Sequence, residues 1–564
     1  MVNIRRVFAA IRPDALIAAL IIFAFCFVEI MSRHGDLATK VGMRLEAGRR
    51  MLNGEYAYLD FWDWSQPVVL KLAAAMVAFH GFLAQHGLVL SLESFTKVCV
   101  WLVIIFSFAL CLVLLGHVSG STRPQPDPRC QLAIGQARLL TPPLLIGFAL
   151  ANYLARFEFG DLQHLFALAF VPFVVLRWLK SSGVEVNFWL TLVIGIFAGW
   201  GVALDLTFWP AVIILELLLA LQCGRSWLKV LPIGEYFGLL LGLAFALINF
   251  MLLTDSQKTA FVKWIMPLRM LSFHEYDRIL DPAVHSPDRR DVLYMLLFAL
   301  PFSVLASKQY KACASFGGLA LFGLALYVVE HQGLSNQILV CQFFSIILLA
   351  ISAFYIFDRV TSPFLAIGRV RSIVILLACT CLAGAVYKAD LAAFNTAYGL
   401  AASRGPSMPV DIFEVVDKKT AWKDPVMIFS YAPHAIFPLL NTVDRKQMGY
   451  LLWSEPIILI SLRGDGEDLS PDLKEFQSYL VHRLKMDVGS ARAKLIIVDS
   501  VRIEEFMENR GLFKAIRKNY VEDPACIYFN DFKEPREDLG YGVYNYRVFR
   551  LKTEAPSPIE GAPH

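Results

Sequence analysis

The sequence has few charged side chains and long stretches without any. Lys, Arg, Asp and Glu make up 18% of its 564 residues, while 57% of the residues are hydrophobic. Soluble globular chains usually carry about 25% charged and about 45–50% apolar residues. The shortage of charge therefore excludes an ordinary soluble protein. It predicts a helical protein that crosses a membrane many times, since a run of about 18–20 apolar residues suffices to span a bilayer.

Nucleotide-binding fingerprints are also missing. The chain contains neither a G-x-x-x-x-G-K-[ST] loop nor a G-x-G-x-x-G turn after a strand, and these are the motifs that hold the phosphates of ATP or of dinucleotides. Their absence argues against an ATP-driven pump, and no nucleic acid is expected as a partner. No internal repeat is apparent either, whereas many transporters consist of paired repeats.

The ten cysteines form no disulfide framework and no metal-ligand pattern. Most of them lie inside apolar segments, where a thiol behaves as a small hydrophobic side chain. The N-terminus, "MVNIRRVFAAIRP", begins like a signal peptide, but no small-residue cleavage site follows the apolar run behind it. We therefore expect an uncleaved first membrane helix.

About eleven apolar segments have the length of a membrane helix. A further apolar stretch, 67–85, contains Lys71 and His80 and is expected to lie along the interface. If this stretch does not cross, the Lys and Arg clusters fall on the cytoplasmic side, while short outer loops such as "EHQGLSN" contain none. If it crossed, every later loop would invert and the positive-inside rule would fail. The expected spans are 13–31, 95–117, 137–153, 163–178, 187–203, 207–223, 232–253, 292–306, 313–330, 335–355 and 371–390.

This topology places the N-terminus in the cytoplasm and two long loops and the C-terminal tail outside. We expect a membrane domain at 1–392, with outer loops at about 32–94 and about 254–291. In the tail, "PVMIF" and "KLIIVDS" are typical of buried strands, and "SPDLKEFQSYLVHRL" begins like a helix. The sequence therefore predicts a soluble α/β domain at 393–552 and a disordered end at 553–564.

Both long outer loops carry Lys and Arg against the charge bias. In "KTAFVKWIMPLRMLSF" the cations alternate with Phe, Trp, Ile, Met and Leu, which is typical of an interfacial helix that holds an anionic lipid headgroup. The alternative is a solvated surface, because long loops are partly exempt from the positive-inside rule.

Acidic side chains stand next to the expected membrane boundary on the outer side. Asp36 follows the first helix, and Glu158 and Asp161 lie in a very short loop after the third. Ionisable groups at this level are costly and are more often functional than those of a soluble surface. The alternative is that Asp36 and Asp161 only cap the helices that follow them, since Asp is a favoured N-cap residue.

These features resemble the GT-C superfamily of membrane glycosyltransferases, in particular protein mannosyltransferases and aminoarabinose transferases. Such enzymes have an acidic motif after the first helix, then a Gly-, Tyr- and Asp-containing element, then a Pro-containing interfacial helix. The matching segments here are "HGD" at 34–36, "GEYAYLDF" at 54–61 and "WDWSQPVVLKL" at 62–72. The chain departs from the family at Leu37, where Glu is common, and at Gln66, where Pro is common.

The resemblance implies a GT-C fold and a sugar transfer at the outer face. An acceptor hydroxyl would attack the anomeric carbon of a sugar carried on a polyprenyl phosphate, with inversion. Asp36 would be the general base, and Asp161 with Glu158 would be a second acid that positions the acceptor or a metal. Cations would stabilise the departing phosphate; those expected to bind it are Lys263, Arg269 and Arg49.

The first outer loop would form the floor of this site. A lone His is more often a hydrogen-bonded structural residue, and Trp at this level is more often a membrane anchor, so structural roles stay open beside substrate contacts. The chemistry requires no cofactor, and a divalent metal on Asp36 and Asp161 stays open. The residues expected to line the substrate cavity are His34, Tyr58, Asp60, Trp62, Asp63 and His164.

The expected function is therefore glycosyl transfer from a polyprenyl-phosphate donor to a lipid, glycan or protein hydroxyl. Short loops and an outer α/β domain suit a bacterial inner membrane, with the C-terminal domain in the periplasm and membrane lipids as further partners. The main rival is a lipid or polysaccharide transporter or flippase, for which Asp205 and Glu216 would be the acids in or beside spans. A non-catalytic assembly or sensor protein is the second rival.

Overall fold

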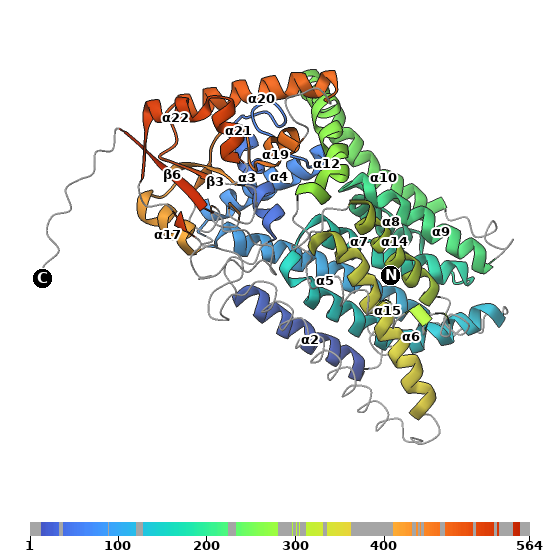
Figure 1. The fold of residues 1–564 in the computed structure, drawn as a ribbon. Coiled ribbons are helices and arrows are strands. Elements are labelled where there is room, and N and C mark those ends of the chain that lie inside the picture. The colour runs from blue at the N-terminus through green and yellow to red at the C-terminus, as the bar shows by residue number, and fades with distance from the viewer. Residues whose placement is uncertain are drawn as a thin grey trace, which may run out of the picture.

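The computed structural model contains a bundle of apolar helices and, beside one end of it, a region built on a β-sheet (Figure 1). Both parts share contacts with the outer-loop elements that lie between them. The structure describes residues 13–32, 38–87, 90–119, 128–223, 233–279, 296, 300–301, 304, 312–330, 335–361, 410–430, 436–437, 440, 445–462, 469–499, 503–523, 527–528 and 545–552.

The bundle helices coincide with nine of the expected spans, and most of them contribute to one hydrophobic core. Helix α7 lies at its centre, because every residue of its apolar window is buried. The expected spans at 292–306 and 371–390 lie mostly or wholly outside the described residues. The bundle consists of α2 (Pro13–Ser32), α5 (Leu92–Ser119), α6 (Pro128–Leu154), α7 (Leu162–Ser181), α8 (Phe188–Ala203), α9 (Trp209–Cys223), α10 (Ile233–Met251), α14 (Ala312–Glu330) and α15 (Ser335–Thr361).

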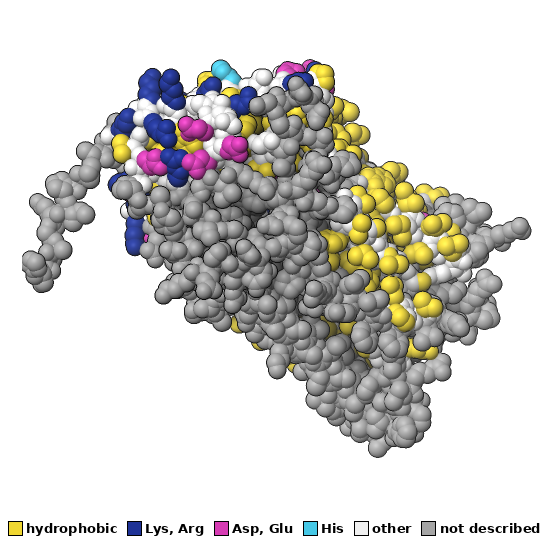
Figure 2. Space-filling view, in the orientation of Figure 1, with side chains coloured by type: hydrophobic (Ala, Val, Ile, Leu, Met, Phe, Trp, Pro, Cys, Tyr) yellow, Lys and Arg dark blue, Asp and Glu magenta, His cyan; other side chains and the backbone are white. Residues whose placement is uncertain are grey.

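Six helices in the described part of the chain are long and apolar enough to cross a membrane: α4 (Pro67–Gln85), α5, α7, α10, α14 and α15. Figure 2 shows apolar side chains on the right-hand part of the bundle, whereas charged side chains gather on the sheet-containing region. The coarse prediction of a helical membrane protein agrees with this structure. The number of crossings stays a prediction, and so does the interfacial placement of 67–85, because α4 has the length and hydropathy of a span.

Helices α8 and α10 pack so closely that only glycine fits between them. Gly195 and Gly199 are spaced by four on α8, as Gly238 and Gly242 are on α10. A Cβ placed on Gly199 would lie 2.2 Å from the carbonyl oxygen of Leu239. This small-residue spacing lets membrane helices approach through their backbones, where van der Waals contact holds them together.

Charged residues bind one another at the C-terminal end of α7. Arg177 donates to both carboxylate oxygens of Glu216 at 2.6 and 2.7 Å, and Lys180 lies 2.8 Å from Glu235. These pairs join α7 to α9 and α10. Since a helix of 20 residues is about 30 Å long, this cluster lies far from residue 161, at the other end of α7. Polar residues therefore lie near both ends of α7, and its middle is apolar.

The sheet has the strand order β2-β1-β3-β6-β4, with β5 also paired to β6. Strand β1 pairs in parallel with β2 and β3, and β6 runs antiparallel to β3, β4 and β5. The two strands predicted from "PVMIF" and "KLIIVDS" form the buried centre. The strands are β1 (Pro425–Phe429), β2 (Lys446–Gln447), β3 (Leu495–Asp499), β4 (Tyr520–Glu522), β5 (Ile527–Tyr528) and β6 (Asn545–Leu551).

The sheet-containing region also has helices, and the longest of these helices begins where the sequence predicts it. Ser470 caps it, since its hydroxyl accepts a hydrogen bond from the Leu473 N–H. Phe476, Leu480 and Leu484 recur at helical spacing and are buried. The helices are α17 (Val410–Lys419), α19 (Glu455–Leu462), α20 (Pro471–Gly489), α21 (Ile503–Asn509) and α22 (Leu512–Asn519).

The elements of the two long loops that are expected outside, α3 and α4 in the first and α11, η4 and α12 in the second, share one hydrophobic core with the sheet region. Buried Trp62 and Leu268 belong to the same cluster as Leu451 and Phe476, so the described part of the α/β region packs directly on both loops. Its expected boundary near residue 392 lies outside the described residues. The loop elements are α3 (Thr39–Leu52), α4, the 3-10 turns η1 (Ala155–Glu158) and η2 (Leu206–Phe208), α11 (Asp255–Ala260), the π-helical turn η4 (Phe261–Ile265) and α12 (Met266–Ile279).

Candidate functional site

A buried ion pair joins the first outer loop to the loop after α6. The Nη1 of Arg44, on α3, donates to Oδ1 of Asp161 at 2.7 Å, and the Arg44 Nε donates to Oγ of Ser65 at 3.3 Å. Arg44 is 9% exposed and Asp161 1% exposed. The two loops that the sequence predicts to form the site therefore meet. Arg44 itself was not predicted, because the sequence shows only another cation in a basic loop.

Asp161 occupies the N-cap position of α7 without capping it. Its backbone is extended, and its side chain makes no hydrogen bond to the first turn of the helix. The carboxylate instead binds Arg44. Helix capping, the structural alternative for this residue, is therefore not what its side chain does, and the pair fixes the carboxylate at the end of the bundle.

Asp63 is a fully buried carboxyl group next to this pair. Its Oδ1 accepts the Ser65 N–H at 2.6 Å, and its Oδ2 has no hydrogen-bond partner within the described residues. Burial raises the pKa of Asp63, although the Ser65 hydrogen bonds and the charge of Arg44 act in the other direction. A carboxyl group with a raised pKa can hold a proton that an ordinary surface Asp would lose.

Tyr58 adopts a left-handed backbone conformation, with φ of 71°. Such a conformation is costly for a residue other than glycine and persists only where surrounding contacts determine it. The Tyr58 hydroxyl donates to the carbonyl of Ser65 at 2.7 Å, and its ring lies 5.1 Å from that of Phe261. The side chain thereby connects the first loop to the second.

Trp62 and Asp60 contact the C-terminal region rather than an open cavity. The backbone N–H of Trp62 donates to the carbonyl of Tyr450 at 2.8 Å, and the ring is fully buried 4.5 Å from that of Trp64. Asp60 is half-buried; its Oδ2 accepts the Tyr56 backbone N–H at 2.8 Å, and its Oδ1 accepts from Arg483 of α20 at 3.4 Å. Within the described residues, no contact joins the side chain of either predicted cavity residue to Asp161.

The three predicted phosphate-binding cations differ in their surroundings. Lys263 is exposed on the π-helical turn, and no described residue forms an ion pair or hydrogen bond with its side chain. Arg269 donates to Asp205 at 2.6 Å, and Arg49 lies 3.3 Å from Glu46. Lys263 is therefore the cation that the structure leaves open to an incoming anion.

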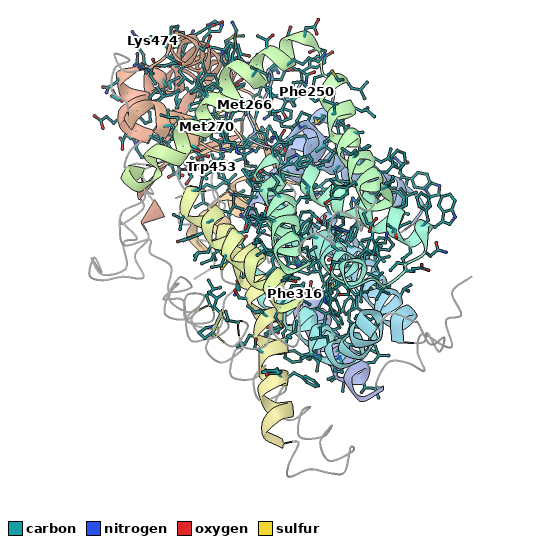
Figure 3. The ribbon with its side chains drawn as sticks, turned by 90° about the vertical axis from the view of Figure 1, so that its right-hand side faces the viewer. Phe250, Met266, Met270, Phe316, Trp453 and Lys474 are labelled. Atoms are coloured by element: carbon teal, nitrogen blue, oxygen red, sulfur yellow. The ribbon has the colours of Figure 1, made fainter. Side chains whose placement is uncertain are left out.

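Helix α12 passes beside the start of α19. Figure 3 shows Met266 and Met270 on α12 near Trp453, whereas Phe316 lies within the helix bundle. Val262, Met266 and Met270 recur every four residues and are 52%, 44% and 59% exposed. The second outer loop therefore presents an apolar stripe and Lys263 on one continuous helical segment.

His164 has both ring nitrogens engaged. The Gly160 N–H donates to Nδ1 at 3.2 Å, so Nδ1 is unprotonated, and Nε2 lies 3.0 Å from Oδ1 of Asn152. The buried ring thus joins α7 to α6. Glu158 ends the η1 turn, where its carbonyl accepts the Asp161 N–H. Asp36 and His34 lie outside the described residues.

A metal site is not formed by the described residues alone. They contain no group of three or more His, Cys, Asp or Glu side chains that could hold a metal ion. Asp161, one of the two predicted ligands, already binds Arg44 through Oδ1, and Asp36 lies outside the described residues. The metal prediction on this pair therefore stays untested.

Comparison with known proteins adds no assignment. No protein-family model matches the sequence, and no curated protein matches it.

Proposed function

We propose that the protein is a membrane glycosyltransferase that moves a sugar from a polyprenyl phosphate to an acceptor hydroxyl at the outer face. The observation that carries the proposal is the Arg44–Asp161 pair, which brings the two acid-bearing loops to one place beside buried Asp63. Carboxyl groups with different environments at one site are what a proton-transferring enzyme requires.

In the proposed reaction Asp36 takes the proton of the acceptor hydroxyl. The acceptor oxygen then bonds to the anomeric carbon from the face opposite the phosphate. The bond from that carbon to the phosphate oxygen breaks, and polyprenyl phosphate leaves with the electron pair. Because Asp161 is neutralised by Arg44, its role is to orient the acceptor rather than to act as a second base.

The donor would bind along the second outer loop. Its phosphate needs a cation, and Lys263 is the exposed one among the three predicted binders. Its polyprenyl chain needs apolar surface, which Val262, Met266 and Met270 offer on the same helical segment. Arg269 would join the phosphate only after leaving Asp205, so we assign Lys263 the first contact.

The finer architecture belongs to the same proposal. We place about eleven spans across a bacterial inner membrane, with the N-terminus in the cytoplasm and the α/β region in the periplasm. The polar residues near both ends of α7 support this arrangement, since Arg177 and Lys180 lie at the bundle end expected inside and the α/β region adjoins the other end.

A transporter is the second candidate, and one observation favours it. Ionisable side chains inside a helix bundle often mark a substrate or ion pathway, and Arg177, Glu216 and Glu235 are such side chains. However, they form pairs at one end of α7, whereas transporters usually bind substrate near the middle of the bilayer. We therefore rank transport below glycosyl transfer.

The direct test supplies the purified full chain in liposomes with a panel of polyprenyl-phosphate sugars and with lipid, glycan and protein acceptors. The expected result is labelled acceptor together with an equal amount of free polyprenyl phosphate. Donor that crosses the bilayer with its sugar–phosphate bond intact would favour the transporter instead. Neither product nor movement would favour the assembly protein.

Two lysines on the same helical segment provide a matched comparison for the donor site. Lys263→Gln is expected to raise the KM for the donor by about tenfold or more, since a hydrogen bond to a charged group contributes about 1.5–3 kcal/mol. Lys258, which lies 3.4 Å from Asp255, is the control, and Lys258→Gln should leave the KM unchanged. Equal KM values for both variants would remove Lys263 from the donor site.

A further inference from the structure

Four consecutive backbone carbonyls of the first outer loop each accept a hydrogen bond from a distant side chain. Gln257 Nε2 donates to the Ala57 carbonyl at 3.2 Å, the Tyr450 hydroxyl to that of Tyr58 at 3.3 Å, and the Tyr479 hydroxyl to that of Leu59 at 2.7 Å. The Asp60 carbonyl accepts from Arg50 at 3.2 Å and from Arg483 at 3.4 Å. Every backbone carbonyl of segment 57–60 is therefore fixed by at least one side-chain hydrogen bond.

Most of these donors belong to the C-terminal α/β region. Tyr450 follows β2, and Tyr479 and Arg483 lie on α20, about 400 residues away in sequence from the carbonyls they bind. The carbonyl of Tyr450 also accepts a hydrogen bond from the backbone N–H of Trp62 at 2.8 Å. A backbone with so many long-range hydrogen bonds takes its shape from its partners rather than from its own sequence.

Two donors remain: Arg50, on α3 of the same loop, and Gln257, which comes from the second outer loop and is itself oriented. The Gln257 Oε1 accepts from the N–H of Thr254 in a capping box at the start of α11. This hydrogen bond turns the amide nitrogen of Gln257 toward Ala57. The ring of Trp264, on the π-helical turn that follows α11, lies 4.9 Å from the Tyr479 ring. The second loop and α20 therefore hold residues 57–60 jointly.

The held conformation is one that the segment would not adopt alone. Tyr58 has a positive φ of 71°, which is unfavourable for a side chain of this size. On leaving this turn the chain places Trp62 and Trp64 against the C-terminal region and Asp63 and Ser65 toward Arg44. The direction of Asp63 and Ser65 therefore depends on the contacts that fix residues 57–60.

We propose that the C-terminal α/β region is a positioning element for the first outer loop, acting through the hydroxyl groups of Tyr450 and Tyr479 on the Tyr58 and Leu59 carbonyls. Its catalytic consequence rests on the proposed glycosyl transfer; its structural consequence does not. The region sets the conformation of 57–62, and through Ser65 and Arg44 it sets the position of Asp161. Tyr450 and Tyr479 touch no reacting atom in this account.

The test compares the double variant Tyr450→Phe/Tyr479→Phe with the single variant Tyr520→Phe in the full chain. Tyr520 is the matched control, because its hydroxyl also donates to a backbone carbonyl, that of Ala493 at 3.0 Å, but inside the α/β region. Two readouts are measured: hydrogen–deuterium exchange of the peptide covering 57–65, and the kcat and KM of sugar transfer.

The double variant is expected to exchange 57–65 faster than wild type and to lose about tenfold or more in kcat with little change in donor KM. A misplacement of about 1 Å at a reacting group can cost about a hundredfold in rate. Tyr520→Phe should match wild type in both readouts. A transfer rate that falls in the control as much as in the double variant would indicate general destabilisation and overturn the proposal.

The two readouts separate the failure of this inference from the failure of the proposed function. Exchange of 57–65 that stays at the wild-type rate in the double variant would overturn the positioning role, whatever the transfer rate. Faster exchange with undiminished transfer would overturn its catalytic part. Absence of transfer in wild type would overturn the proposed function alone, while the exchange experiment would still decide whether the C-terminal region holds the loop.

Discussion

Arg44 and Asp161 show how a single buried contact decides what an acidic residue can do. Asp161 stands where a helix cap is expected, yet its carboxylate is neutralised by a guanidinium 117 positions earlier in the chain. The pair is almost completely buried, so each charge depends on the other for its stability. Asp63, one hydrogen-bonding step away through Ser65, has no cation of its own in direct contact among the described residues.

Removing one member of this pair should destabilise the protein strongly. Arg44→Met keeps an apolar stem but removes the guanidinium from the buried Asp161 carboxylate, and breaking a buried pair in this way typically costs about 3–5 kcal/mol. Adding Asp161→Asn should restore part of the loss, because the buried negative charge is then gone. Apparent free energies of unfolding in detergent would measure both. The control is Lys258→Met, which removes an exposed pair with Asp255 and should change stability by less than about 1 kcal/mol.

If Asp161→Asn failed to improve the stability of Arg44→Met, the ion pair would not be the source of the loss. Equal effects of Arg44→Met and Lys258→Met would lead to the same conclusion.

Asp63 should make stability depend on pH. Burial raises its pKa in the folded protein, so the folded state holds the proton more tightly than the unfolded chain, whose Asp has a pKa of about 3.9. The stability that this proton brings is present at low pH and is lost as pH rises through the folded-state pKa. The Asn side chain of Asp63→Asn cannot ionise. The melting temperature of this variant should therefore rise relative to that of wild type as pH increases from about 4 to about 7.

Glu522 provides a comparison of opposite sign. Hydrogen bonds from Arg547 lower its pKa, so the stability it brings is present at neutral pH and is lost as pH falls. Glu522→Gln should therefore melt below wild type at pH about 7 and approach it below pH about 4. A melting-temperature difference for Asp63→Asn that is the same at every pH would show that Asp63 does not change its protonation between the folded and unfolded states.

Secondary-structure elements were predictable where local sequence decides them. The apolar runs of the bundle, the strands β1 and β3 and the Ser470-capped helix α20 follow from hydrophobic periodicity and capping. The first outer loop was not predictable beyond its helices, because Tyr58 has a left-handed backbone held by side chains of residues 257, 450 and 479. Contacts over such distances leave no periodic signal.

The packing of α8 on α10 gives a prediction at the same scale. Gly199→Ala should destabilise the bundle, because its Cβ would lie 2.2 Å from the Leu239 carbonyl and one of the two backbones must move. Gly81→Ala is the control: it lies inside α4 with nothing within 4 Å of the added Cβ, and alanine favours a helix by about 1 kcal/mol over glycine. In detergent, only Gly199→Ala should therefore have a lower melting temperature than wild type. A decrease of the same size in both variants would contradict the close packing.

The placement of α4 decides the topology of the whole molecule. Cysteines introduced at exposed Asn53 and Gln85 flank this helix. If α4 lies along the outer interface, a membrane-impermeant maleimide should label both in intact cells. Cysteine at exposed Glu185, in the loop between α7 and α8, should be labelled only after lysis. Labelling of just one of the two flanking positions from outside would show that α4 crosses and that every later loop is inverted.

The proposed function depends on an acid that follows the first helix in sequence, Asp36, acting on a lipid-linked sugar. The measurement that tests this most directly is transfer from polyprenyl-phosphate sugars by wild type and Asp36→Asn in liposomes, with donor binding measured separately. We predict that the variant binds donor as wild type does and loses transfer by a factor of about 10² to 10⁴, the usual contribution of a general base. Transfer at the wild-type rate by Asp36→Asn would contradict the account.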